Sequence, residues 1–152
     1  MKKQGLKIKV NALIQSFNVH TGKINKETRV HNLVVNTGLE RVAHLIGGLS
    51  SDFFEYVAIG TSSTAVNASQ VSLLAEVKRA AVTPTDNGNG IILYDHTFTF
   101  GTGESYTIRE YGIFDTTGAS AGTMFNRLID GGHAVDIDNS IRVRITVTVV
   151  NS

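Results

Sequence analysis

Few residues in this chain have the types and spacing that chemistry requires. The best group is the segment His133-Ala-Val-Asp136-Ile-Asp138, because imidazole and carboxylate groups are common ligands of divalent metals. His133 and Asp136 have opposite parity on a strand, and acidic residues near glycine are also typical of turns. The segment is therefore a candidate metal site at His133, Asp136 and Asp138. The alternative is an ordinary polar turn with no metal.

The rest of the sequence argues against an enzyme. It has no glycine-rich phosphate loop, no serine nucleophile elbow, no zinc-protease helix motif and no calcium-loop spacing. The chain has 0 cysteines, which excludes thiolate catalysis and cysteine-ligated zinc. His44 lies off the apolar face of a predicted helix and His96 lies among aromatic residues, so we interpret both as structural. The sequence predicts no catalytic residue and no cofactor.

The charge pattern does not favour nucleic acid or a membrane as a partner. There are 14 Lys and Arg residues against 13 Asp and Glu residues, a net charge of +1, so no global field attracts polyanions. Lys2, Lys3, Lys7 and Lys9 form a basic N-terminal segment, but lysines on an edge strand also guard against aggregation. No continuous apolar run is long enough for a signal peptide or a membrane span.

Period-2 alternation dominates the chain and predicts β-strands. In the first strand Leu6, Ile8 and Val10 share one face, and a turn at Thr21-Gly22 predicts a hairpin within an N-terminal arm or hairpin of about residues 1–35. Residues 91–100 and 105–115 are predicted to form a second hairpin around the sequence GTGE.

The final strand gives the clearest alternation. Its inward residues are predicted to be Ile141, Val143, Ile145, Val147 and Val149, with Arg142 and Arg144 on the outer face. Because the 152 residues contain no linker or repeat, we predict a single domain, 1–152. The fold class is mainly β, an antiparallel β-sandwich or barrel of about seven to eight strands with one short helix packed on it.

The helix is predicted over residues 37–46. Thr37 and Glu40 have the spacing of a capping box, and Gly47 and Gly48 end the helix. The apolar residues follow helical spacing on one stripe: Leu39, Val42, Ala43 and Ile46. A helix of this length needs tertiary packing, so we expect this stripe to be a core plug.

Two surfaces are candidate contacts with other subunits. Lys7, Ile8, Lys9 and Val10 lie on an edge strand, and we expect Leu6, Ile8 and Val10 to pair with the sheet edge of another chain or to lie on a larger surface. The second candidate is the outer face of the last strand, with Arg142 and Arg144, since arginine is enriched at interfaces.

From about Val30 onward the sequence resembles a family of small virion proteins of tailed bacteriophages. The similarity rests on the order of these segments: NLVVNTGLERVAHLIGG, FEYVAIGTSSTA, LLAEVKRAA, TFTFGTGESYTIREYGIFD and GTMFNRLI. The family pattern "[VI]-x-E-x-G-[IL]-F" is met by residues 108–114. One departure is GTSS after Ile59, where the family often has a further glycine, which affects a loop.

The resemblance implies a non-enzymatic structural protein of the virion, made in the bacterial host cytoplasm. Our first hypothesis is a capsid decoration (cement) protein on the outer capsid surface, a homo-oligomer, expected to be a trimer, that binds the major capsid protein. The second is a tail-fibre, baseplate or neck component. The third, from the residues alone, is a metal-dependent carbohydrate-binding or hydrolytic module built on His133, Asp136 and Asp138.

Overall fold

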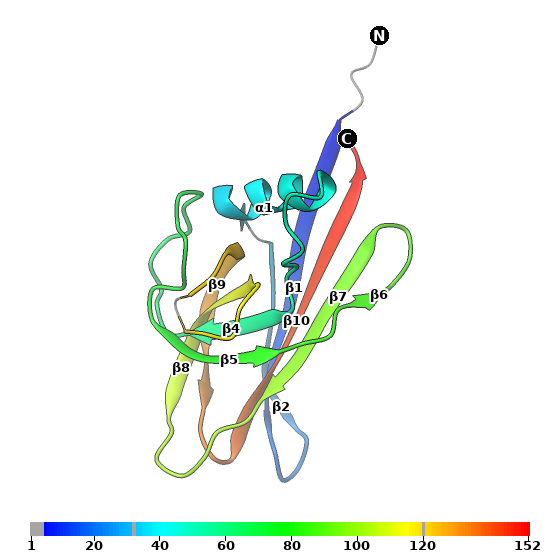
Figure 1. Ribbon diagram of the computed structural model, residues 1–152. Coiled ribbons are helices and arrows are strands. Elements are labelled where there is room, and N and C mark those ends of the chain that lie inside the picture. Colours follow the sequence, from blue (N-terminus) through cyan, green and yellow to red (C-terminus); the bar gives the residue numbers. More distant parts are fainter. Residues whose placement is uncertain (1–4, 32, 120) are drawn as a thin grey trace.

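In the described part of the chain, two antiparallel five-stranded sheets and one short helix make up the fold (Figure 1). The computed structural model describes residues 5–31, 33–119 and 121–152. The predicted fold class, mainly β with one short helix, is confirmed as a β-sandwich. The described residues contain ten strands, more than the seven to eight expected, because the short strands β3 and β6 carry no alternation signal of their own.

In each sheet, consecutive strands in the following order lie side by side. Sheet A contains β2 (Ile24–His31), β1 (Leu6–Asn18), β10 (Asn139–Asn151), β7 (Ile91–Phe98) and β6 (Thr85–Asp86). Sheet B contains β3 (Leu33–Val34), β9 (Met124–Val135), β8 (Tyr106–Phe114), β4 (Tyr56–Gly60) and β5 (Glu76–Ala81). The helix is α1 (Asn36–Ile46).

The period-2 pattern sets the core, because alternate residues of a strand point to one face. Ile14 of β1 lies opposite Val143 of β10, and both are fully buried. Ile59 and Ile108 supply the facing side from sheet B and are equally buried. The inward residues predicted for the last strand are buried from Ile141 to Val147, whereas Val149 is exposed.

One predicted hairpin is confirmed and the other is wrong. β1 and β2 pair around a turn in which Gly22 takes the left-handed conformation, with φ 72°. β7 and β8 do not pair with each other. β7 lies between β10 and β6 in sheet A, whereas β8 lies between β4 and β9 in sheet B. Both edges of β7 are therefore occupied, and residues 99–105 cross from one sheet to the other.

The first strand pairs within its own chain over its whole length. Its register with β10 runs from Leu6 opposite Asn151 to Asn18 opposite Asn139. The prediction that Leu6, Ile8 and Val10 pair with another chain is thus wrong for the edge that β10 occupies. Lys2 and Lys3 of the predicted arm lie outside the described residues.

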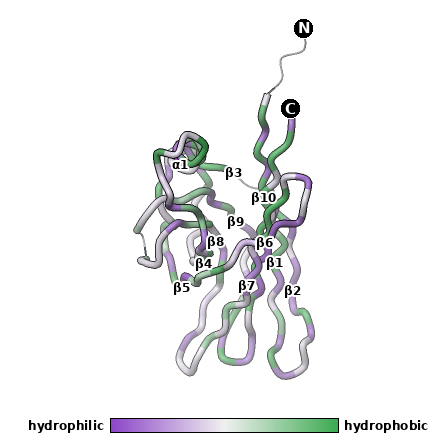
Figure 2. The backbone as a smooth tube through the Cα atoms, turned by 45° about the vertical axis from the view of Figure 1, so that its right-hand side comes forward, coloured by the Kyte–Doolittle hydropathy of each residue, from purple (hydrophilic) through white to green (hydrophobic). Residues whose placement is uncertain are grey.

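β1 and β10 extend together beyond the sandwich as a two-stranded ribbon (Figure 2). We call the paired residues 6–10 and 147–151 the β1/β10 extension. β2 pairs with β1 only from Asn11 to Phe17. Within the described part of the chain, the other edge of residues 6–10 therefore has no paired strand.

The helix is present, but it docks by a face turned away from the expected one, and of the predicted stripe Val42 packs against the core. Gly38 is its buried residue, and a Cβ there would overlap the backbone of Phe125. Thr37 donates from Oγ1 to the Met124 carbonyl over 3.2 Å. The predicted capping box is wrong, because the helix begins at Asn36 and Val35, at the N-cap, makes no side-chain cap.

The prediction that the apolar stripe is a core plug is also wrong. Leu39 is 48% exposed and Ile46 is 77% exposed, Ala43 is exposed and Val42 is half-buried. The physical reason is that small and hydrogen-bonding residues allow the closer approach to β9. Arg41 completes that attachment through an ion pair with Asp115 and a 2.9 Å hydrogen bond to Thr123 Oγ1.

Candidate functional site

A fully buried ion pair lies on the face of sheet B that the segment 61–75 covers. Arg127 of β9 donates from Nε to Glu110 Oε2 of β8 over 2.9 Å, and both side chains are 0% exposed. A buried charge is tolerated when it is paired and its remaining hydrogen-bonding positions are filled. The surrounding loop fills those of Glu110 and of Arg127 Nη1, whereas the buried Arg127 Nη2 has no hydrogen-bond partner among the described residues.

The loop of residues 61–75 folds over this pair. The Ala75 and Leu74 amides donate to Glu110 over 2.7 and 3.0 Å. Arg127 donates from Nη1 to the Thr64 carbonyl over 2.8 Å. A Cβ at Gly60 would overlap Glu110, which explains a glycine there. Glu110, the acidic residue of the 108–114 motif, therefore anchors a loop.

The structure does not bring His133, Asp136 and Asp138 together. His133 is 1% exposed and lies inside the sandwich. Asp136 accepts from Asn139 over 2.9 Å at the turn into β10, whereas Asp138 contacts His20 over 2.9 Å. In residues 5–31, 33–119 and 121–152, no group of three or more His, Cys, Asp or Glu residues could hold a metal. Strand alternation places His133 and Asp136 on opposite faces, and Asp138 lies in the turn that follows, so the two aspartates belong to the polar turn given as the alternative.

His133 instead joins a buried polar network that sequence reasoning missed. Its Nε2 lies 2.9 Å from Asp130 Oδ2, and its Nδ1 lies 2.9 Å from Ser16 Oγ. Thr28 donates to Asp130 over 2.6 Å, and Tyr111 donates to the same carboxylate over 3.2 Å. The only sequence signal was Ser16, a polar residue at an inward position of an alternating strand.

The network has the residue types of a catalytic triad, but its geometry suits packing. Ser16 and His133 are 2% and 1% exposed, so a substrate does not reach the hydroxyl. Burial raises the pKa of Asp130, but hydrogen bonds from His133, Thr28 and the Gly132 amide together lower it below its usual value. Burial, followed by the Asp130 charge, raises the pKa of Tyr111. The network is a satisfied polar cluster between the sheets.

His44 and His96 lie apart from this network. His44 Nε2 is 3.9 Å from Glu40 Oε1 on the half-exposed side of α1. The His96 ring packs edge-on against Phe98, with ring centroids 4.6 Å apart. Burial lowers the pKa of His96. Each histidine therefore has a packing or pairing partner close by in the chain.

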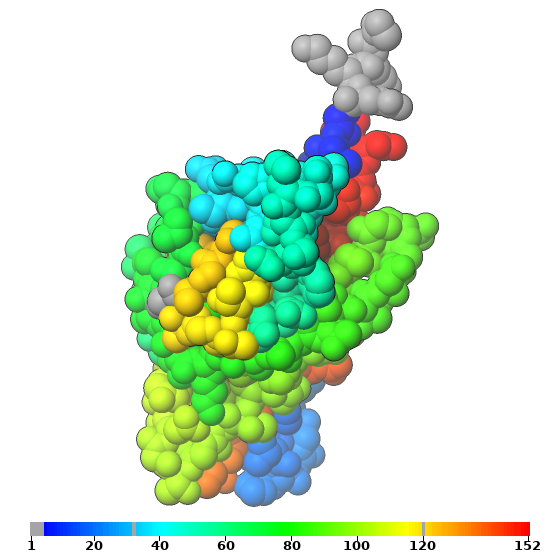
Figure 3. All heavy atoms as spheres, viewed as in Figure 1, coloured from blue at the N-terminus to red at the C-terminus, as the bar shows by residue number. Residues whose placement is uncertain are grey.

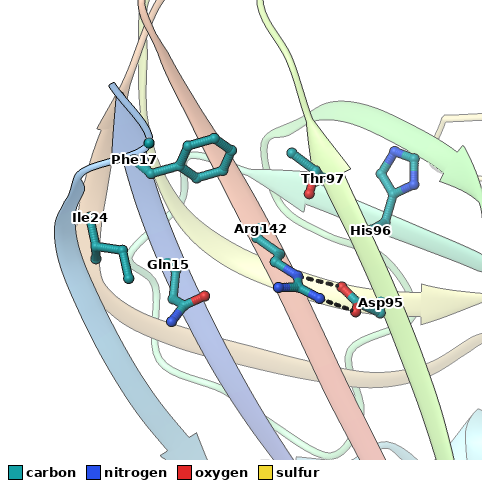
Figure 4. Close-up of a pocket in the computed structure, with 8 residues that line it drawn as sticks. Gln15, Phe17, Ile24, Asp95, His96, Thr97 and Arg142 are labelled. Atoms are coloured by element: carbon teal, nitrogen blue, oxygen red, sulfur yellow. Dashed lines mark hydrogen bonds and ion pairs between the residues drawn. The ribbon is translucent and has the colours of Figure 1, made fainter. Parts of the chain in front are cut away.

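The outer face of sheet A carries a shallow polar depression of about 580 Å³ (Figure 4). Arg142 donates to both carboxylate oxygens of Asp95 over 2.9 and 2.6 Å. These hydrogen bonds lower the pKa of Asp95 and raise that of Arg142. Arg144 Nε lies 3.4 Å from the same carboxylate. Both arginines lie on the outer face as expected, and their role in a subunit contact stays a prediction.

A second, apolar groove of about 470 Å³ lies at the end of the sandwich between α1 and the β1/β10 extension. We call this the apolar groove, and its lining residues are Leu6, Ile8, Leu33, Val34, Leu39, Val42, Ala43 and Ile46. Figure 3 shows the extension projecting beside the helix, and Figure 2 places β3 between them. The groove contains every residue of the helical stripe.

Leu6 is 64% exposed on one wall of the groove and Ile46 is 77% exposed on the other. Single exposed apolar residues are ordinary on a protein surface, but a contiguous apolar patch is typical of an interaction site. The groove is thus the strongest candidate for a binding surface, and its lining suits an apolar partner.

No protein-family model, curated protein or solved structure matches the chain. In the described part of the chain, no helix has the length and apolar character needed to cross a bilayer.

Proposed function

We propose that this protein is a non-enzymatic structural component of a tailed-bacteriophage virion, and that it is a capsid decoration protein. In this role it binds the outer capsid lattice beside the major capsid protein and stabilises it. The expected state is a homo-oligomer, with a trimer as the first expectation, since small contacts repeated by symmetry add up to stable attachment.

The apolar groove is the observation that carries this proposal. It leaves Leu6, Leu39 and Ile46 in water, although a free-standing domain gains stability by burying such residues. A protein that works in an assembly buries them against a neighbour. The groove also lies at one end of the sandwich, so a partner bound there leaves the other surfaces of the domain free.

The roles of the motif residues support a structural protein. Gly38 and Gly60 permit close backbone approaches, and Glu110 anchors the loop 61–75. The residues singled out for metal chemistry lie apart, so the geometry gives the metal-dependent module no support. The resemblance to phage virion proteins supplies the biological setting, and the fold is compatible with it.

The proposal is tested by quantitative mass spectrometry of purified virions from the phage that encodes the chain. Hundreds of copies per particle are expected for a capsid decoration protein. A handful of copies would instead place the protein in the tail fibre, baseplate or neck. Absence from purified particles would overturn the virion role altogether.

A further inference from the structure

We infer that the apolar groove binds an extended strand of a second virion protein in which apolar and acidic residues alternate. This inference rests on the proposed function for the setting in which the partner occurs. The groove and the free edge of β1 determine the chemistry of the partner.

One edge of β1 is open beside the groove. β2 stops pairing with β1 at Asn11, so residues 6–10 present one edge that no described strand covers. An added strand gains backbone hydrogen bonds along such an edge whatever its side chains. The same residues line the groove, since Leu6 and Ile8 point into it. A strand added here therefore directs alternate side chains toward α1.

The face of β1 opposite the groove carries positive charge. Lys7 and Lys9 are exposed and alternate with the groove residues Leu6 and Ile8. Their partners on β10 are Val150 and Thr148, which carry no charge. Among the ion pairs of the described residues, none includes Lys7 or Lys9. Side chains directly opposite each other on paired strands interact, so acidic residues on the partner strand meet these two lysines.

A second copy of the same edge is disfavoured by the same lysines. In the antiparallel register that places Ile8 opposite Ile8 of the other copy, Lys7 of each copy lies opposite Lys9 of the other. Like charges at directly opposed positions destabilise the pairing. Lysine on an exposed edge therefore opposes self-association while leaving an acidic strand free to bind.

The size of the groove also favours a strand over a globular subunit. Four of its residues are 40–77% exposed: Leu6, Leu33, Leu39 and Ile46. Their exposed side-chain area is on the order of 200–300 Å², which a strand with two or three apolar side chains covers. A standard interface between globular partners buries about 800 Å² on each side.

The test uses the full chain and two synthetic peptides of seven residues, one alternating valine with glutamate and the other alternating valine with lysine. Binding is followed by NMR titration and by hydrogen exchange of the backbone amides at residues 6–10. We expect the glutamate peptide to bind more tightly and to slow exchange at these amides. The double variant Lys7→Glu, Lys9→Glu should reverse the preference, with a change of at least about fivefold for each peptide.

Two further variants control the test. Lys23→Glu changes an exposed lysine at the far turn of the β1–β2 hairpin and should leave both affinities unchanged. Ile46→Glu places a charge in the groove and should weaken both peptides, while far-UV circular dichroism verifies that the variant folds. Failure of both peptides to bind, or equal binding of the two, would overturn the inference.

Sedimentation of the full chain tests the remaining alternative, in which a second copy of the chain fills the groove. A homo-oligomer that Ile46→Glu disperses would show that a second copy fills the groove, which also overturns the inference. The virion copy number tests the proposed function separately. A protein that is abundant in virions but binds neither peptide would keep the proposed function and lose the inferred partner.

Discussion

Arg127 Nε and Glu110 Oε2 lie 2.9 Å apart, and solvent reaches neither side chain. The pair joins the adjacent strands β8 and β9 of sheet B to the loop of residues 61–75, because both residues also hydrogen-bond to the loop backbone. Removing one member leaves the other as an uncompensated buried charge. The first prediction follows from this dependence.

Glu110→Gln should lower the free energy of unfolding by about 3–5 kcal/mol, since it leaves Arg127 charged and unpaired inside the protein. Urea denaturation measures this change, and limited proteolysis should show cleavage within residues 61–75. Glu40→Gln, at an exposed position of α1, is the control and should stay within about 0.5 kcal/mol of the parent. A loss below about 1 kcal/mol for Glu110→Gln would contradict the anchoring role.

Gly38→Ala should destabilise the protein, although alanine ordinarily favours a helix over glycine by about 1 kcal/mol. The reason is steric, because the added Cβ overlaps the backbone of Phe125. Gly47→Ala is a matched control, since a Cβ there lies 3.5 Å from the Ala43 carbonyl oxygen, an ordinary van der Waals contact. Thermal unfolding of both variants makes the comparison. If Gly38→Ala proved as stable as the parent, the close packing of α1 on β9 would be refuted.

Ile46→Ala should change the free energy of unfolding by no more than about 0.5 kcal/mol, because the side chain is largely in water. Ile14→Ala, at a fully buried position of β1, should cost about 2–5 kcal/mol. Equilibrium unfolding of the purified protein at low concentration compares the two. A large cost at Ile46 would mean that the helical stripe is covered in solution.

Acid should lower the free energy of unfolding by protonating Asp130. Burial raises the pKa of this carboxyl, but hydrogen bonds from His133, Thr28 and the Gly132 amide lower it overall below 3.8. A lowered folded-state pKa stabilises the fold fully above the unfolded-state value, and this contribution disappears as pH falls through the folded-state pKa. We therefore expect the free energy of unfolding to fall below about pH 4, and to fall less in Asp130→Asn.

The measurement is urea unfolding at a series of pH values for the parent, Asp130→Asn and a control. Asp52→Asn changes an exposed residue and should follow the parent curve. The same acid dependence in the parent and in Asp130→Asn would show that the network does not govern the response.

Strand alternation was enough to predict the fold class and the core face of β1 and β10. Ile14 and Val143 are buried as the pattern requires. The pairing of β7 and β8 was predicted wrongly because a short polar turn joins strands across two sheets as readily as within one. Local sequence carries no information about which edges are already occupied.

The helix shows a second limit of sequence patterns. Its apolar stripe indicated which residues avoid water, but it did not indicate whether this chain or another protein covers them. Gly38 and Arg41 determined the docked face through a close approach and an ion pair. The network around His133 was missed because Ser16 and Thr28 are more than 100 residues away from it in the sequence.

The pairing of β1 with β10 sets an order of events during synthesis. Residues 6–18 pair with β10 only after residues 139–151 have been synthesised. Contacts between residues so distant in sequence form slowly. At about 5–20 residues per second, the ribosome adds the intervening strands over several seconds. A chain that stops before β10 lacks half of the β1/β10 extension. Under the proposed function, a truncated copy lacks the strand that holds Leu6 and Ile8 beside the groove, so assembly would exclude it.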